Sequence, residues 1–251
     1  MIFAARYGGD ALDFFVYILF TLVAVCIALV LHEVSHGLVA KWNGDYTAKY
    51  SGRLSLNPLR HFDPIGFVMM MLVGFGYAKP VPVNPGNFKH YKRGLITVAI
   101  AGVVMNLIIA FFAVMFLALC VFGYNRAVVS MSSAGLVNLC WYLSRFFAIL
   151  ASINLSLVFF NLLPIFPLDG FRVVEALTRR GNRFCAFMRT NGHYILYGLV
   201  GLSFIISMAQ SYVALPYWFE YFDILGTYLN FFVTNVHWLF SSFWSLIIPL
   251  I

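Results

Sequence analysis

The stretch FFVYILFTLVAVCIALVLHEVSH, residues 14–36, decides the fold and joins two signals in one segment. Its first part, Phe14–Leu31, holds no charged residue, and 18 or more consecutive apolar residues are long enough to span a bilayer. Its last five residues form an HExxH pentad. On a helix this spacing sets His32 and His36 one turn apart on one face, with the carboxylate of Glu33 beside them. That arrangement is typical of zinc sites, so the stretch predicts metal chemistry inside a membrane.

The composition extends the membrane prediction to the rest of the chain. Of its 251 residues, 62% are hydrophobic and 10% are charged, whereas soluble domains carry about 25% charged residues. Further apolar runs follow at residues 95–122, 146–168, 194–219 and 224–251. The sequence therefore predicts an all-α polytopic membrane protein with about five transmembrane helices.

The positive charge of the chain has a topological explanation. The net charge is +7, and thirteen of the sixteen Lys and Arg residues fall within residues 41–93 and 172–189. Such clustering in alternate loops is the positive-inside pattern, and it places both segments in the cytoplasm. We therefore expect a multi-pass protein of the cell membrane without a nucleic-acid partner.

The segment after the first span differs from the rest. Residues 52–57 alternate polar and apolar side chains, which is the periodicity of a strand. Residues 64–78 are apolar but short, and the prolines of residues 79–85 exclude helix. We expect a small membrane-associated β-sheet here, together with a re-entrant segment at residues 64–78.

A third metal ligand is predicted at Asp169, which ends the third apolar run. It is the only acidic residue between Asp63 and Glu175. A carboxylate at that depth costs about 2.5–3.5 kcal/mol unless a partner offsets it, and a divalent cation would do so. The predicted topology places Asp169 near the cytoplasmic ends of the spans, at the depth of the pentad. A catalytic zinc has three protein ligands, so one Zn²⁺ per chain is expected.

Together these motifs resemble a known family. The HEVSHG stretch, the KPVPVNP stretch and the pattern N-x-x-P-x-x-P-x-D-G, which ends at Gly170, are similar to those of the site-2 proteases, which are intramembrane zinc metalloproteases. The likeness covers residues 20–180 and is closest to the short bacterial and archaeal members without PDZ or CBS domains. It implies a protease core over residues 1–190. Beyond that core, the last two apolar runs predict two transmembrane helices over residues 191–251.

The resemblance also implies roles for single residues. His32, His36 and Asp169 would bind zinc, Glu33 would be the general base, and Asn161 would support the oxyanion or order a ligand. The segment near the substrate would consist of Lys79, Pro80, Val81, Pro82, Val83 and Asn84. The stretch before Asn106 has Val103 in place of the family's proline, so no role is assigned to Asn106. A structural role is expected for His61.

The leading hypothesis is an intramembrane endopeptidase that cleaves transmembrane segments of membrane proteins, with its active site towards the cytoplasm. Because such segments are helical, they must unwind first, and the extended residues near the site offer an edge for an unwound strand. Two alternatives remain: a transporter or channel for divalent metal ions, and an inactive protease relative that acts as a membrane chaperone. The physiological substrate and the oligomeric state cannot be derived from the sequence.

Overall fold

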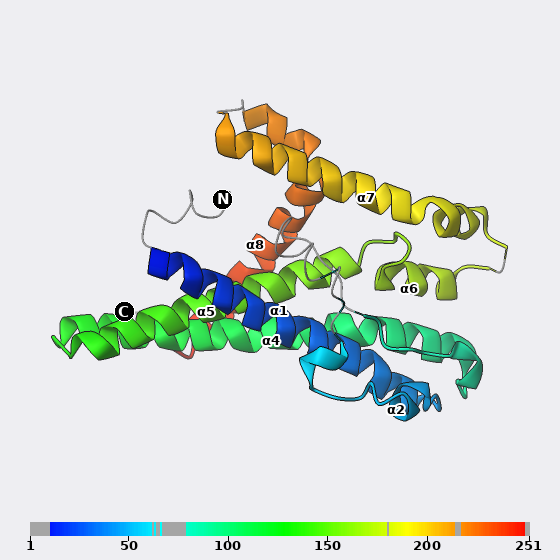
Figure 1. Cartoon of the computed structure of the whole chain (residues 1–251), viewed down its shortest axis with the longest axis horizontal. Helices are drawn as coiled ribbons and strands as arrows, with labels where there is room; N and C mark the ends of the chain where they lie inside the picture. The colour runs from blue at the N-terminus through cyan, green and yellow to red at the C-terminus, as the bar shows by residue number, and fades with distance from the viewer. Residues whose placement is uncertain are drawn as a thin grey trace. The chain divides into compact units, whose positions relative to one another are not determined.

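Helices make up most of the computed structural model, which describes residues 11–61, 63, 66, 79–179, 181–213 and 217–248. Among these residues, four helices are long and apolar enough to cross a membrane (Figure 1). They are α1 (Ala11–Trp42), α4 (Tyr91–Val129), α5 (Ala134–Asn161) and α7 (Arg183–Tyr212). The shorter helical elements are α2 (Thr47–Tyr50), η2 (Pro58–Arg60), η3 (Pro85–Asn87), α6 (Asp169–Leu177), η4 (Tyr217–Phe222) and α8 (Ile224–Ser245).

The described residues do not support the prediction of about five spans, because four of their helices are long and apolar enough to cross a membrane. A helix does form at Ile224–Ser245, but it is not among the helices apolar enough to span a membrane. The reason is a series of polar side chains along α8, namely Asn230, Thr234, Asn235, His237, Ser241 and Ser242.

The predicted β-sheet is also absent, because the described residues contain no strand. Residues 79–84 are not helical, as their prolines require. Their amides donate hydrogen bonds to side chains and to a loop carbonyl, and not to a neighbouring strand. The amide of Lys79 donates to the carbonyl of His61, and the amide of Val81 donates to Glu33. The predicted re-entrant segment, residues 64–78, lies outside the described residues apart from Gly66.

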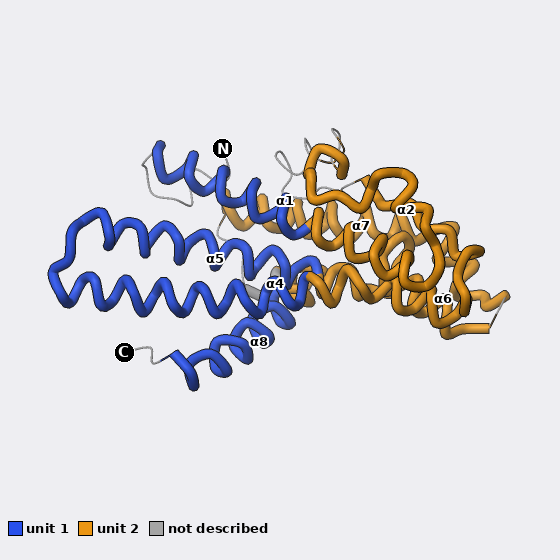
Figure 2. Tube along the Cα trace, turned by 90° about the horizontal axis from the view of Figure 1, so that it is seen from below, with its two compact units in different colours: residues 1–28, 106–157, 230–251 blue, residues 29–105, 158–229 orange. Residues whose placement is uncertain are grey.

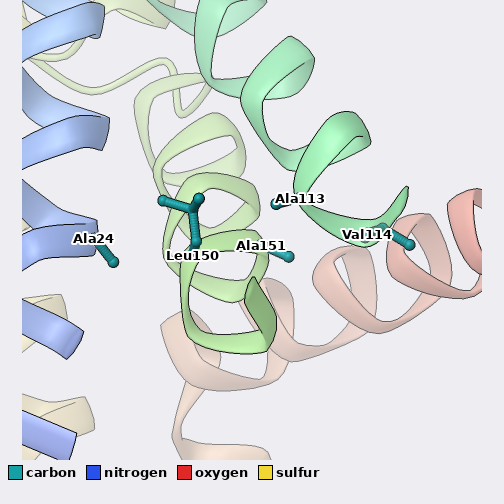
Figure 3. Packing of buried hydrophobic residues seen from close by; sticks show 5 residues of the cluster. All are labelled: Ala24, Ala113, Val114, Leu150 and Ala151. Atoms are coloured by element: carbon teal, nitrogen blue, oxygen red, sulfur yellow. The ribbon is translucent and has the colours of Figure 1, made fainter. Parts of the chain in front are cut away.

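Contacts divide the chain into two compact units, whose boundaries fall inside α1, α4, α5 and α8 (Figure 2). The first unit comprises residues 1–28, 106–157 and 230–251. Its core joins three helices, and three of its five buried residues are alanines, shown in Figure 3: Ala24, Ala113, Val114, Leu150 and Ala151. Small residues let the backbones of membrane helices approach closely, so this unit is held by helix packing.

The second unit comprises residues 29–105 and 158–229. One of its cores joins Ala40, Phe88 and Val98, and another joins Ile165, Leu168 and Leu196. The first core packs the end of α1 against the start of α4, and the second packs the turn before α6 against α7. This unit therefore contains all the predicted site residues. The division of the chain at residue 190 stays a prediction.

Candidate metal centre

The two histidines of the pentad meet as the spacing predicts. Both lie on α1 and are buried, with ring centroids 4.6 Å apart. The Nε2 atoms of His32 and His36 are 3.0 Å apart. Two ring nitrogens therefore face the same point.

Asp169 completes the cluster from a distant part of the chain. It is the first residue of α6, and its Oδ2 lies 3.2 Å from Nε2 of His32 and 3.1 Å from Nε2 of His36. Ligand atoms around a tetrahedral zinc ion are about 3.3 Å apart, because each lies about 2.0–2.1 Å from the metal. The triangle of ligand atoms therefore has nearly the dimensions that zinc requires.

The hydrogen bonding of this carboxylate fits a cation as well. Asp169 is 7% exposed, and its Oδ2 is buried with no hydrogen-bond partner. A buried polar atom without a partner is costly, and a metal ion removes that cost. Two imidazoles and one carboxylate also form the ligand set of a catalytic zinc site, which keeps one position open.

Two glycines allow the close contacts that position Asp169 at the start of α6. A Cβ on Gly170 would lie 2.3 Å from the carbonyl oxygen of Leu162, so only glycine lets α6 begin this close to the end of α5. A Cβ on Gly192 of α7 would lie 2.9 Å from the Cβ of Phe166. The Nε atom of Arg189 donates to Glu175 at 2.6 Å and ties α7 to α6. Asp169 is therefore fixed from both sides.

Helix α4 shapes the cluster in two ways that our sequence reasoning missed. The Nδ1 atom of His36 lies 2.7 Å from the carbonyl oxygen of Val98. A carbonyl only accepts, so Nδ1 carries the proton and Nε2 keeps its lone pair for a metal. One turn further along α4, a Cβ on Gly102 would lie 2.5 Å from Cε1 of His32. The small residues Ala101 and Gly102 could have indicated this close contact from the sequence. The hydrogen bond to the carbonyl of Val98 could not have been predicted, because every residue has a backbone carbonyl.

Glu33 lies beside the cluster and contacts the segment expected near the substrate. The backbone N–H of Val81 donates to its Oε2 at 2.7 Å. Gly37, one turn after Glu33, provides the space: a Cβ there would lie 2.6 Å from Leu54 and 3.2 Å from Val81. The segment of residues 79–84 thus contacts the general-base candidate through Val81, and its place near the substrate stays a prediction.

Two charged residues hold this segment, and neither was predicted. Arg53 donates to the carbonyl oxygens of Arg60, Lys79 and Pro80. Asp45 is fully buried, and its Oδ2 accepts from the amide of Asn84 at 2.7 Å.

The other carboxylate oxygen of Asp45 also accepts hydrogen bonds. Its Oδ1 accepts from Nδ2 of Asn87 at 2.8 Å and from the amide and hydroxyl of Thr47. Burial raises the pKa of the Asp45 carboxyl, but these hydrogen bonds outweigh burial and hold that pKa below its usual value. Asp45 is therefore an ionised anchor that joins the end of α1 to residues 84–87.

The remaining polar candidates have structural contacts. His61 is buried, and its Nε2 lies 2.8 Å from the carbonyl oxygen of Ser55, in keeping with the structural role expected for it. Ser35 donates to the carbonyl of Leu31 within its own helix. Asn106, in the first unit, is fully buried and donates to Oδ1 of Asn154 at 3.1 Å. Asn161 is the half-buried last residue of α5, and its catalytic role stays a prediction.

Comparison with known protein families agrees with this geometry. Residues 20–204 match the model of peptidase family M50, the family of the site-2 proteases. The chain belongs to peptidase family M50. Because this match covers most of the chain, the resemblance found in the motifs is confirmed.

Two curated relatives carry metalloprotease names. The Bacillus subtilis (strain 168) protein named "Putative zinc metalloprotease YwhC" is 41% identical over 167 residues, which cover 66% of this chain and 71% of the relative. The Mycolicibacterium smegmatis protein named "Putative zinc metalloprotease Rip2" is 27% identical over 215 residues, or 81% of this chain and 73% of the relative. No solved structure matches the chain. This M50 peptidase is accordingly a zinc metalloendopeptidase, and its four apolar helices make it a multi-pass membrane protein.

Proposed function

We propose that this M50 peptidase is an intramembrane endopeptidase that hydrolyses peptide bonds within the transmembrane segments of other membrane proteins. In this proposal His32, His36 and Asp169 bind one zinc ion per chain, and Glu33 is the general base. The observation that carries it is the convergence of three ligand atoms, two from the apolar helix α1 and one from the start of α6, at 3.0–3.2 Å from one another.

The position of the cluster along α1 supports cleavage within the bilayer. Trp42, the last residue of α1, is 71% exposed, and tryptophan is enriched at the membrane–water interface. A helix rises about 1.5 Å per residue, so His36 and His32 lie about 9 and 15 Å from Trp42 along the axis. Both distances fall within the half-thickness of the hydrocarbon core, which is about 15 Å.

The chemistry divides between the metal and the protein. Zinc, when bound, acts as a Lewis acid that polarises the scissile carbonyl and makes water more acidic. Glu33 takes the proton of the attacking water and passes it to the leaving amine. The carbonyl of Val98 keeps His36 in the tautomer that can act as a ligand, and Asn161 supports the oxyanion or orders a ligand.

Residues Lys79–Asn84 are proposed to receive the unwound substrate. Pro80 and Pro82 have no N–H, and the amides of Lys79, Val81 and Asn84 donate to acceptors within the protein. Within this segment the amide of Val83 has no acceptor among the described residues. A substrate strand therefore pairs best at Val83, which makes the pairing short and specific in register.

The charge pattern supports a cell membrane with the active site towards the cytoplasm. Lys41 lies in the last turn of α1, and Lys49, Arg53 and Arg60 follow in the next connection. By the positive-inside rule this end of α1 faces the cytoplasm.

The test compares wild type with Glu33→Gln in liposomes. Bound zinc is measured by elemental analysis, and cleavage is measured on model transmembrane peptides. The proposal expects zinc retained and hydrolysis abolished in the variant. Equal hydrolysis by both proteins would refute it, and so would metal transport in place of hydrolysis.

A second test concerns the substrate. Because a helical carbonyl is tied up by internal hydrogen bonds, Gly or Pro placed in the substrate span is expected to raise cleavage. No effect across several positions would contradict the presentation of substrate as an unwound strand.

A further inference from the structure

The hydrogen bond between Val81 and Glu33 joins two parts of the chain that are 48 residues apart. The carboxylate of Glu33 has two oxygens, and a general base needs one of them free to take a proton. The N–H of Val81 occupies Oε2 at 2.7 Å. Hydrogen bonds to an ionised acceptor are stronger than neutral ones, so this contact restricts the rotation of the Glu33 side chain.

The donor is held in place on both sides. Two residues before it, the amide of Lys79 donates to the carbonyl of His61 at 2.9 Å. Three residues after it, the amide of Asn84 donates to Oδ2 of Asp45 at 2.7 Å. Arg53 binds the carbonyl that precedes the Val81 amide, at a distance of 3.2 Å. The N–H of Val81 therefore has little freedom to leave Glu33.

Side-chain packing fixes the same contact. Val81 is 7% exposed and lies over Gly37, which is one turn after Glu33 on α1. Because Gly37 has no Cβ, the extended segment can approach the helix closely enough for a backbone donor to reach the carboxylate. A peptide N–H only donates, so it does not compete with Glu33 for the proton of the water.

We propose that the backbone amide of Val81 is the positioning group of the general base: it holds Oε2 of Glu33 and leaves Oε1 to face the attacking water. This inference rests on the proposed function, in which Glu33 is the base. It makes the substrate-facing segment and the base one hydrogen-bonded unit. The group acts through Glu33, so its loss should lower kcat and leave zinc binding unchanged.

The sharpest test replaces the amide of Val81 with an ester by incorporating the α-hydroxy analogue of valine. This change removes the hydrogen and adds no atoms, and valine delivered by the same suppression method is the matched control. We expect kcat to fall about 10- to 100-fold, as for a misplaced catalytic group, while KM and zinc content stay at control values. A kcat equal to that of the control would overturn the inference, and so would loss of zinc.

Three further variants separate the amide from its neighbours. Val81→Pro also removes the N–H, whereas Val81→Ala keeps it, so the alanine variant should have the higher kcat. Val83→Pro removes the donor proposed for substrate pairing and should raise KM instead. If Val81→Pro and Val83→Pro change the same parameter, Val81 has no separate role in positioning the base.

A spectroscopic readout does not depend on activity. In protein labelled with ¹⁵N-valine, the amide proton of Val81 should resonate downfield, and it should move upfield in Glu33→Ala. An unchanged resonance would overturn the inference. Failure of wild type to cleave any transmembrane peptide would instead refute the proposed function, so the two failures are distinguishable.

Discussion

Among the residues that the structure describes, two buried clusters of polar side chains differ in how donors and acceptors are matched. In the first unit Asn106 donates to Oδ1 of Asn154, whose own amide donates to the carbonyl of Leu150 at 2.8 Å. In the second unit two imidazole nitrogens and the Oδ2 of a carboxylate converge. In the first cluster each of these donors meets an acceptor, so these hydrogen bonds form without a bound ligand. In the second cluster these three potential ligand atoms face one another, and together they could hold a metal ion.

This difference shows that burial alone does not identify a functional polar group. Both asparagines are fully buried, more so than His32, His36 or Asp169. A buried amide pair stabilises helix packing. Convergent acceptors cost free energy unless a ligand binds them, so they indicate a site.

The largest expected effect tests whether the convergent acceptors bind the metal. Asp169→Asn keeps the shape of the side chain but introduces N–H donors and removes the charge. The variant should fall from one zinc ion per chain to background and lose measurable hydrolysis. Elemental analysis of purified protein measures this, with Asn106→Leu as the control that should retain its zinc. Full zinc content in Asp169→Asn would show that the aspartate is not a ligand.

A smaller effect is expected where α4 supports the cluster. In Gly102→Ala the new methyl group would overlap the ring of His32, so the ring must shift. Changes to groups that orient metal ligands typically cost about 10- to 100-fold in metal affinity, and a similar loss is expected here. Zinc competition with a chelator of known affinity measures it.

The matched control for Gly102 is Gly198→Ala on α7, where a Cβ meets no atom within 4 Å. It should bind zinc as wild type does. Equal zinc affinity in both variants would contradict the account of α4.

The asparagine pair should affect stability and leave metal binding unchanged. Asn154→Leu leaves Asn106 without its acceptor, and an unsatisfied buried polar group costs about 1–3 kcal/mol. The double variant Asn106→Leu/Asn154→Leu should lose less than the sum of the two single variants. Unfolding free energies in a double-mutant cycle measure the coupling. Additive losses, or loss of zinc, would show that the pair is not the self-contained contact described above.

The smallest effect concerns Asp45, whose carboxylate is satisfied by donors as the asparagines are. Its pKa is lower in the folded than in the unfolded protein, so its contribution to stability is present above the unfolded pKa of about 3.9. That contribution is lost as the pH falls through the folded pKa. Stability of wild type should therefore decline more steeply below pH about 4 than stability of Asp45→Asn. Parallel declines would contradict this role.

The sequence predicted the site better than its surroundings, for physical reasons. His32, His36 and Asp169 carry polar side chains, and burying such side chains in apolar segments costs free energy. Their spacing and depth therefore indicate that they belong to one site. The carbonyl of Val98 and the missing side chain of Gly102 carry no such cost, so their contacts with the histidines became visible only in the structure.

The two errors in the fold have a similar origin. Alternating residues at 52–57 and the extended segment at 79–84 suggested a sheet, but prolines remove amides, and the remaining donors bond to Glu33, Asp45 and a loop carbonyl. The last helix formed at the expected place, but its polar side chains make it too hydrophilic to count as a span.

X-ray absorption at the zinc edge tests the central claim most directly, because it reports the ligand atoms of the metal in the intact protein. We expect two imidazole nitrogens and oxygen ligands at about 2.0–2.2 Å in wild type, with the oxygen contribution reduced or the zinc absent in Asp169→Asn. A sulfur shell at about 2.3 Å, or a wild-type protein that binds no zinc, would contradict it.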